Sequence, residues 1–578
     1  MSRLLACVFL LAALSFGDAF SEDSSAVFRV DSIRYDIGDV FDDSKSHTKY
    51  DKWAYDLLNW IHIETREHTV RKLLLFDEGD SVNLDYLLES ERFLRSQSFL
   101  SDANISMSQE NGKNIANVHT SDNWTLTIPI GAGFSGKEWT YDNLNYSIGL
   151  QESNFLGFGQ LLGFYYGHNE YRDMWQVEYG DPHFLIRYNQ LNFLYSRNTD
   201  GYTAIWKMYK PFLSRNVNQW AYTLEGLKNK RIAYYYGSGE LPPGAAPFDT
   251  TGKKIKSLAT YNGENPVKLI KVEDFIEDSL SLRLSRSFGG VQRKLYIGAT
   301  YDYQRLTGNY GRVVSNPFLD GDDIYAIDSA SAVDEWVPER KDSRIGMYLR
   351  YTNLHYEKIK NFRNVKWTED INKGAVLEAR VSKNYEQLGS ADNDIRLDFL
   401  SNLYLGRDWN HLNLATVMNL YLDHGHRRDF YGAISGEYIF HPSNTFSTVL
   451  KGKADFYRDA RYGYQLSLGG ADGGFAGFHT GFYAGQARVF ANLEQRFFTD
   501  IEIATLMPVL VAFGSVGETA WEFKDINRKD LIYVVGIGAR FVQTKSISHL
   551  VNKFDVTIPL NGVEKGERHY SITVTKEL

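Results

Sequence analysis

Cysteine and proline are scarce in this chain of 578 residues. Cys7 is the only cysteine, so no disulfide can form within the chain and no set of thiolates can hold a metal. Only 12 residues are proline, whereas 15% are aromatic. Proline interrupts the hydrogen bonding of sheets, and aromatic residues favour strands. This composition therefore predicts long strands rather than the loops of a secreted enzyme.

Long apolar runs are missing apart from one near the start. Arg3 precedes an apolar run over 4–16, and small residues follow at Gly17 and Ala19. A run of about 13 residues is too short to span a bilayer as a helix, so we interpret residues 1–19 as a signal peptide cleaved after Ala19, not as an uncleaved anchor. Cys7 does not mark a lipoprotein, because it comes before a complete apolar region. Without a second such run, a helical membrane protein is excluded.

Positive charge is not in excess, and common enzyme motifs are absent. The net charge of -9 and the lack of a basic cluster argue against nucleic acid as a partner. We find no helical histidine pair, serine elbow, phosphate loop or zinc ligand cluster. His424 and His426 follow a strand in a polar loop, and the adjacent Glu369 and Asp370 face opposite sides of a strand. We therefore expect no enzyme activity, metal or cofactor.

The segment 20–122 has a mixed pattern that predicts a small α+β domain with a core of its own. Alternating apolar residues over 30–37 predict a first strand, and the segment 53–63 fits either a helix or an extended chain. Strands over 103–108 and 114–119 are expected on either side of a turn. Asn83 is a good N-cap for a helix. The leucines expected on the apolar face of that helix are Leu84, Leu87, Leu88 and Leu94.

The segment 123–578 alternates between apolar and polar residues with a period of two. The clearest run covers 411–423, where leucines face one way and Asn413, Asn419 and Asp423 face the other. The same alternation recurs over 375–382, 487–494 and 533–541. Aliphatic and charged faces on strands of about ten residues predict a transmembrane antiparallel β-barrel with lipid outside and water inside. A soluble β-sandwich also alternates, but it predicts shorter strands around a shared core.

Two stretches carry a resemblance to a known family. The segment 69–80, followed by 89–95 and the strand start at 102–105, resembles one POTRA domain. The segment 149–159 is similar to the first hairpin of barrels of the BamA/TamA family. The resemblance implies a mostly β protein, with a POTRA-like module in 20–122 and a barrel in 123–578, for which we expect sixteen strands. It also implies a place in the bacterial outer membrane, with the module in the periplasm.

The same family carries a loop that folds into the barrel lumen. Its arginine-glycine-aromatic motif corresponds here to Ala476-Gly477-Phe478, so alanine stands in the place of the arginine. The acidic partner expected on a neighbouring strand is also missing, and we assign its position to Gly514. The glycines could instead serve backbone turns alone. The candidate loop residues are Gly469, Gly470, Phe475, Ala476, Gly477 and Phe478, and those of the barrel partner region are Glu494, Arg496, Phe513, Gly514 and Gly517.

The resemblance also implies a function and partners. A barrel of this family would insert or translocate client outer-membrane or secreted polypeptides, which its POTRA-like module receives. Outer-membrane lipid and periplasmic chaperones or accessory proteins are the other expected partners. The alternatives are a passive porin or surface-binding barrel, and an exported enzyme on a β-sandwich or propeller.

Overall fold

The computed structural model describes most of the chain between residues 27 and 575. The expected signal peptide, Gly470, Gly477 and His424 lie outside the described residues. No helix within the described ranges is long and apolar enough to cross a membrane. The described ranges are 27–38, 40, 60, 62–134, 144–169, 172–213, 219–237, 268–290, 292–308, 311–314, 340–360, 368–407, 409–423, 426–459, 466–469, 474–476, 478, 483–499, 501–502, 506–520, 522–543, 551–562 and 565–575.

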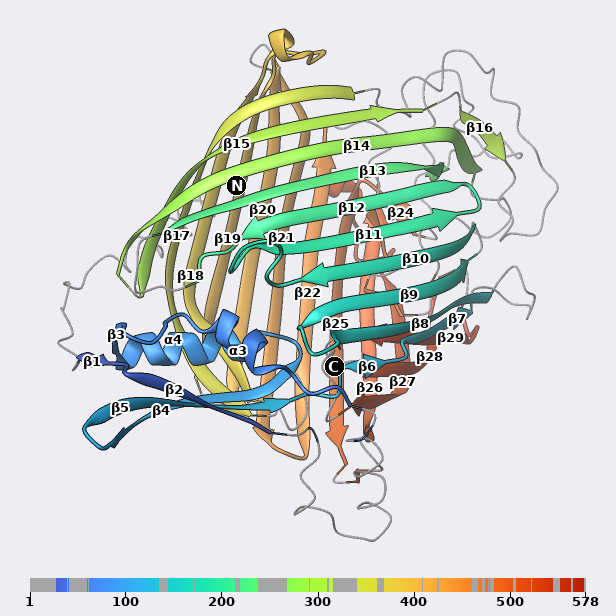
Figure 1. Cartoon of the computed structure of the whole chain (residues 1–578). Helices are drawn as coiled ribbons and strands as arrows, with labels where there is room; N and C mark the ends of the chain where they lie inside the picture. The colour runs from blue at the N-terminus through green and yellow to red at the C-terminus, as the bar shows by residue number, and fades with distance from the viewer. Residues whose placement is uncertain are drawn as a thin grey trace, which may run out of the picture.

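Residues 27–122 form a small unit that we call the N-terminal module (Figure 1). Its central sheet has the strand order β2-β5-β4, with β2 parallel and β4 antiparallel to β5. Two helices pack on this sheet, and β1 pairs with β3 beside them. The elements are β1 (Val27–Arg29), β2 (Ser32–Gly38), α3 (Glu67–Leu73), β3 (Ser81–Asn83), α4 (Leu84–Arg95), β4 (Leu100–Glu110) and β5 (Lys113–Asp122).

Helix α4 begins where the sequence predicts, but a different face is buried. The Asn83 side chain accepts a hydrogen bond from the backbone N–H of Tyr86 at 2.9 Å, which confirms the N-cap. Leu84 and Leu88 are 58% and 44% exposed, so they do not belong to the apolar face as expected. The helix is rotated because Glu91 packs inward and accepts a hydrogen bond from the backbone N–H of Ile105 in β4 at 2.8 Å.

The remaining strands form a closed antiparallel barrel (Figure 1). Its strands are β6 (Leu126–Thr127), β7 (Ile130–Phe134), β8 (Leu144–Phe155), β9 (Gln160–Asn169), β10 (Arg172–Asp181), β11 (Gln190–Asn198), β12 (Gly201–Lys210), β13 (Trp220–Gly237), β14 (Lys268–Gly289), β15 (Arg293–Thr307), β16 (Gly311–Val314), β17 (Arg340–Lys360), β18 (Thr368–Asn384), β19 (Ile395–Arg407), β20 (Asn410–Asp423), β21 (His426–Ser443), β22 (Phe446–Arg458), β25 (Ala487–Phe498), β26 (Leu506–Ala520), β27 (Ile532–Gln543), β28 (Val551–Pro559) and β29 (His569–Thr575).

The expected number of sixteen strands is wrong. Within the described residues the barrel sheet contains 22 labelled strands. β6 and β7 pair with β8 in one continuous register, so they form a single interrupted strand. β16 pairs with β14 in the register of β15, so it continues β15, which itself pairs with β17. Taking two from 22 leaves 20 strands around the lumen. Alternation predicts the faces of strands, but it does not count them where the turns between them are as short as two residues.

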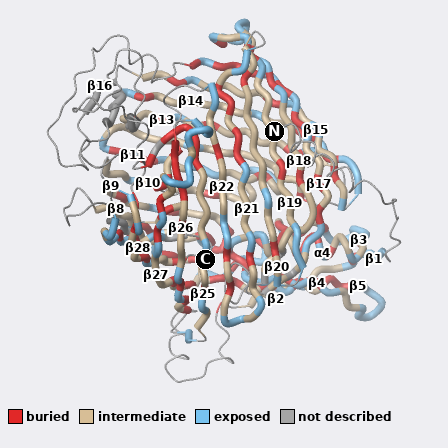
Figure 2. Tube along the Cα trace, turned by 180° about the vertical axis from the view of Figure 1, so that it is seen from behind, coloured by how far each residue is buried: buried red, intermediate tan, exposed pale blue. Residues whose placement is uncertain are grey.

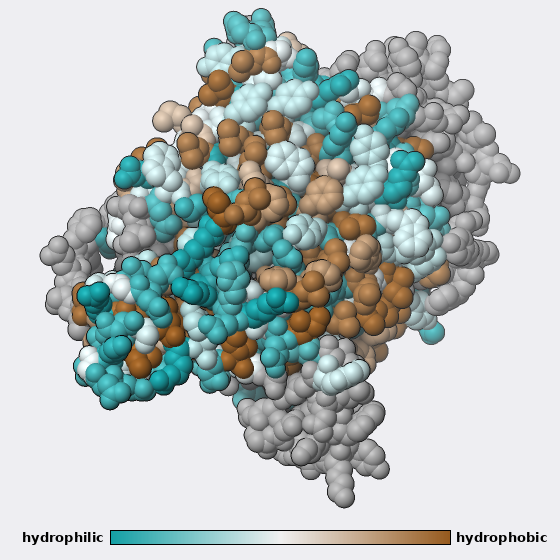
Figure 3. Space-filling view, in the orientation of Figure 1, coloured by the Kyte–Doolittle hydropathy of each residue, from teal (hydrophilic) through white to brown (hydrophobic). Residues whose placement is uncertain are grey.

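The two faces of the barrel wall differ as the alternation predicts. On β17 the side chains of Ile345, Met347 and Leu349 are 51%, 69% and 47% exposed on the outside, whereas Arg344 is 2% exposed on the lumen side. Figure 2 shows this interleaving of buried and exposed residues along the wall, and Figure 3 shows apolar side chains gathered over β8 and β9. The barrel is therefore a transmembrane one. A cross-strand row that marks the lumen face consists of Lys207, Glu225, Ser281, Asp302 and Arg344.

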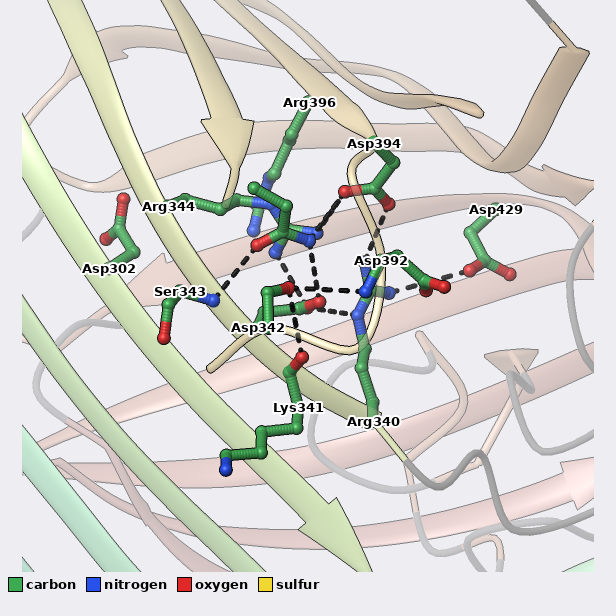
Figure 4. A network of polar contacts seen from close by, with 12 residues as sticks. Asp302, Arg340, Lys341, Asp342, Ser343, Arg344, Asp392, Asp394, Arg396 and Asp429 are labelled. Carbon is green, nitrogen blue, oxygen red and sulfur yellow. Dashed lines mark hydrogen bonds and ion pairs between the residues drawn. The ribbon is translucent and has the colours of Figure 1, made fainter. Parts of the chain in front are cut away.

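One wall of the barrel contains a buried ion network (Figure 4). Arg344 donates hydrogen bonds to Asp342 at 2.7 Å and to Asp394 at 2.9 Å, and Arg340 is also bonded to Asp342. The ring of Tyr421 lies 4.2 Å from the Arg340 guanidinium and 4.9 Å from that of Arg344. These groups join β17, β20 and the segment before β19. The network fixes this part of the wall, because each buried charge has an opposite charge within reach.

A charged residue should cost more stability on the lipid face of the barrel wall than on the lumen face. Met347→Arg places a cation on the lipid face of β17 and should destabilise the barrel by about 2–4 kcal/mol if the residue lies near the bilayer midplane. Ile205, which lies on the lumen face two residues from Lys207 and is 42% exposed, supplies the control. Ile205→Arg should cost less than about 1 kcal/mol. Urea unfolding of the protein in lipid vesicles measures both, and equal losses would contradict the assignment of faces.

Candidate functional site

The barrel closes through a short seam between its first and last strands. Only two residue pairs, Ser571 with Gly133 and Ile572 with Ala132, join β29 to β7 in the described residues. By comparison, β28 and β29 share seven pairs. The first strand is interrupted at Pro129, which has no N–H, although its carbonyl accepts a hydrogen bond from Gly149 N at 2.9 Å. The seam is therefore the weakest joint between described strands of the wall.

The segment between β22 and β25 packs against the lumen face near the seam. It includes the short strands β23 (Leu466–Ser467) and β24 (Ala484–Gly485), which pair with each other. Four of its side chains are buried together against β27, and we call these the loop cluster. Phe478 also stacks on His569 of β29, with ring centroids 4.5 Å apart. The loop cluster consists of Leu468, Phe475, Phe478 and Tyr483, which pack with Ile532 and Val534.

A buried ion pair holds the entrance of this loop. The Arg488 guanidinium donates to both carboxylate oxygens of Asp455, at 2.9 and 2.7 Å, and to the backbone carbonyl of Ser467 at 2.5 Å. Arg488 is 3% exposed and Asp455 is completely buried. The alternation along the sequence predicts Arg488 on the polar face of its strand but does not assign it to the loop. Arg488 stands at the start of the strand that follows the loop, and this position indicates a contact with the loop.

The structure brings several of the predicted loop and barrel residues together. Phe475 and Phe478 are in the loop cluster, the backbone N–H of Gly469 donates to the Ser467 hydroxyl at 3.1 Å, and Ala476 is half-buried. Gly517 faces the loop, since a Cβ there would lie 2.9 Å from a methyl of Leu468. Gly474, one of the glycines of this loop for which a backbone turn is expected, has a φ of +97° and lies against the Phe490 ring, so a side chain is excluded there.

The pairing of Ala476 with Gly514 does not fit this geometry. Gly514 stands opposite Leu493 on one side and Val535 on the other, and these side chains are 52% and 42% exposed on the outside of the barrel. Directly opposed residues share a face, so position 514 points to lipid. The lumen position in this part of β26 is Ser515, which is 7% exposed. An offset of one residue reverses the face of a strand, and this caused the error.

Glu494 and Arg496 belong to a second ion network in the lumen. They are bonded to each other at 2.5 Å, and Glu494 also lies 3.4 Å from Arg540 of β27. Arg540 in turn donates to Asp555 of β28 at 2.6 Å. Arg540 and Asp555 were not predicted as site residues. The four charges join β25, β27 and β28, on the side of the barrel that leads to β29.

The N-terminal module is docked on turns at one end of the barrel, which we call the module end. The Arg187 side chain, in the turn between β10 and β11, donates to the Lys72 carbonyl at 3.0 Å and to Asp77 at 2.6 Å. The Thr69 hydroxyl donates to the carbonyl of Gly157, in the turn between β8 and β9, at 2.8 Å. Leu213, which follows β12, enters the core of the module. The expected separation of the two cores is therefore wrong, because barrel turns complete the core of the module.

Burial shifts the titration of two groups in this contact. The pKa of His183 is lowered to about 4, first by burial and then by the nearby Lys72, Arg187 and His68, while Asp181 opposes the shift. Burial also raises the pKa of Tyr188 to about 12. His183 is therefore uncharged at neutral pH, where it lies among cationic groups.

Comparison with known proteins gives structural matches alone. No family model and no curated protein matches the chain. BamA from Haemophilus ducreyi, in a structure lacking POTRA domains 1-3, is similar at 13% identity and a TM-score of 0.34, over 95% of this chain and 84% of that one. CdiB from Acinetobacter baumannii is similar at 11% identity and a TM-score of 0.43, over 95% and 73%. OccK11 from Pseudomonas aeruginosa is similar at 11% identity and a TM-score of 0.30, over 78% and 95%.

Removing one partner of the loop ion pair should release the loop. Asp455→Asn leaves the Arg488 charge buried without its carboxylate, and we expect a loss of about 3–5 kcal/mol in barrel stability. The double variant Asp455→Asn with Arg488→Met should recover part of this loss. Thermal unfolding in detergent, together with proteolysis between residues 459 and 486, measures both effects. Additive losses in the double variant would mean that the pair does not hold the loop.

Acid should weaken the docking of the module through His183. Because its pKa in the folded protein is about 4, below the unfolded value near 6.5, the folded state binds fewer protons between these values. The stability that neutral His183 supplies is complete above about pH 6.5 and is lost as the pH falls towards 4. Hydrogen exchange in α3 should therefore accelerate over this window in the wild type and less so in His183→Gln. Equal pH dependence in the two proteins would contradict this role.

Proposed function

We propose that this chain inserts or translocates client polypeptides across the bacterial outer membrane, with the module in the periplasm. The observation that carries the proposal is the short seam between β7 and β29. A porin needs a wall that stays closed, whereas an insertase needs a joint that opens towards lipid and exposes strand edges to an incoming chain.

The energetics of the seam support lateral opening. Opening the seam separates only two described residue pairs, whereas separating β28 from β29 would break the pairing of seven. An unpaired backbone group in lipid costs several kcal/mol, which would drive the exposed edges to pair with a client strand. The seam edge of the first strand continues past Pro129 into β6, which leaves a length of backbone that a client strand can occupy.

The module offers two edge strands for client binding. In β4, the edge N–H of Ile105 donates to the Glu91 carboxylate of α4. The edge carbonyl of Ala103 accepts a hydrogen bond from Arg95 of the same helix. In β2, the outward N–H of Ile33 is bonded to Glu78 at 3.1 Å. We therefore place client pairing by β-augmentation on the remaining lengths of these edges, 107–110 in β4 and 35–37 in β2.

The other proposed partners follow from the same arrangement. Outer-membrane lipid contacts the apolar outer face, and a periplasmic chaperone or accessory protein would deliver clients to the edges of the module. No cofactor or nucleotide has a part in this mechanism, since opening of the seam and strand pairing supply the free energy.

A disulfide across the seam tests the proposal. Ala132→Cys with Ile572→Cys, in a chain that carries Cys7→Ser, should join the two seam strands on oxidation. Client barrel insertion into proteoliposomes should then fall to background and return on reduction, because the strands can no longer separate.

The control pair is Ile148→Cys with Tyr166→Cys, which joins β8 to β9 inside the wall and should leave insertion unchanged. Swelling of the same liposomes with small solutes measures passive diffusion in parallel. Full insertion by the oxidised seam variant would refute lateral opening, and solute flux without any insertion would favour the porin.

A further inference from the structure

Two turns at the module end of the barrel hold bulky residues in the left-handed backbone conformation. Leu156, between β8 and β9, has a φ of +55°. Leu185 and Tyr188, between β10 and β11, have φ values of +65° and +66°. This conformation is strained for a bulky residue, whereas glycine adopts it freely. A bulky residue at such a position therefore needs a compensating interaction of its side chain.

The packing of Tyr188 supplies such an interaction, but the two leucines remain exposed. The Tyr188 ring packs edge-on against Phe93 of α4, with the ring centroids 6.2 Å apart. Leu185 and the adjacent Ile186 are 83% and 62% exposed, and Leu156 is 47% exposed. Contact of these large aliphatic groups with water is unfavourable. The two turns therefore present an apolar surface that is suited to a partner outside the chain.

The lipid face of the barrel is short where these turns lie. On β9 and β10 its apolar side chains form three cross-strand pairs, of which Phe164 with Val177 is the middle one. Three pairs span about 14 Å along the strands, whereas the apolar band of an outer-membrane barrel is about 25 Å tall. Towards the module the next two polar groups satisfy each other, since Gln160 donates to Asp181 at 2.9 Å. Phe155 pairs directly with Gln160, so it faces the same way, and the apolar surface resumes there.

Cations lie beside the exposed apolar groups. The Arg66 guanidinium lies 4.2 Å from the centre of the Phe158 ring and donates to the Leu156 carbonyl at 2.9 Å. Arg187 belongs to the second turn and is paired with Asp77 of the module at 2.6 Å. The phosphates of phospholipids lie directly outside the acyl chains. Cations next to exposed apolar side chains therefore suit the surface of a membrane.

We propose that Leu156, Leu185 and Ile186 insert into the phospholipid leaflet at the module end of the barrel. Continuity identifies lipid as the partner, because Phe155 joins these turns to the lipid face of the wall. Insertion transfers the three aliphatic side chains out of water, which compensates for the strained backbone of the two leucines.

The turn between β10 and β11 thereby binds the module and the membrane at the same time. Arg187 donates to the Lys72 carbonyl and to Asp77, while Leu185 and Ile186 enter the leaflet. A movement of the module away from the barrel has to break the first attachment or withdraw the second. The inference rests on the transmembrane placement of the barrel and not on the proposed insertion activity.

Fluorescence of a probe at position 185 tests the inference in the full-length protein in lipid nanodiscs of phosphatidylethanolamine and phosphatidylglycerol. Leu185→Cys, in a chain that carries Cys7→Ser, takes a nitrobenzoxadiazole label. Its emission should shift to the blue, and lipids with a spin label near the start of the acyl chain should quench it. Aqueous iodide should quench it only weakly. Ile186→Cys, labelled in the same way, should give the same result and replaces the first variant if that one does not fold.

Leu388→Cys is the matched control, because Leu388 is also a leucine, 45% exposed, in the short helix Glu386–Leu388 between β18 and β19. This hairpin lies at the end of the barrel away from the module (Figure 1). Iodide should quench its label strongly and spin-labelled lipid weakly. The proposal is overturned if the labels at positions 185 and 186 behave like the label at 388. It is also overturned if they are shielded from iodide without being quenched by lipid, since that result would indicate a protein contact.

Discussion

The structure depends on one constraint, which is that each backbone N–H and C=O group in the membrane must find a partner within the sheet. Closure of the barrel satisfies it, and closure is complete only where β29 meets the first strand. There the wall relies on two residue pairs, whereas the wall around Arg344 is reinforced by buried ion pairs and an aromatic ring. Resistance to opening is thus distributed unevenly around the barrel, and a force on the whole sheet would separate the seam first.

The position of the module adds to this asymmetry. Strand β5 ends at Asp122, which accepts a hydrogen bond from Thr65 N at 2.7 Å, and β6 begins only four residues later. The described contacts of the module with the barrel are on Asn154 of β8, on the turns after β8, β10 and β12, and on β17. The first side of the seam is therefore anchored to the module, while the other side is anchored through Glu494 and Arg540 to the lumen networks. A displacement of the module would act on one strand of the seam more than on the other.

The alternation along the sequence predicts the faces of the strands, but it predicts neither their number nor the side chains that join them. Alternation identifies Ile537 as outward and Arg540 as inward, because each follows from the period of two within one strand. It does not reveal that Arg344 meets Asp394, fifty residues away, since that contact depends on the register of three strands. The placement of Gly514 failed for a related reason. A motif aligned one residue out of register inverts the face while the pattern still looks plausible.

The two treatments of buried charge in the lumen show how the fold manages its polar interior. Around Asp342 and around Glu494, arginines and carboxylates come from neighbouring strands, so the countercharge is intramolecular and the network is complete when the barrel folds. Beside Lys294 the wall of the cavity between α4 and β15 carries cations and hydroxyls, and the Lys294 ammonium donates to the Gly289 carbonyl. A network of the first kind fixes strands permanently. The joint between α4 and the wall is of a different kind, since the Arg92 guanidinium lies 4.8 Å from the centre of the Tyr356 ring on β17.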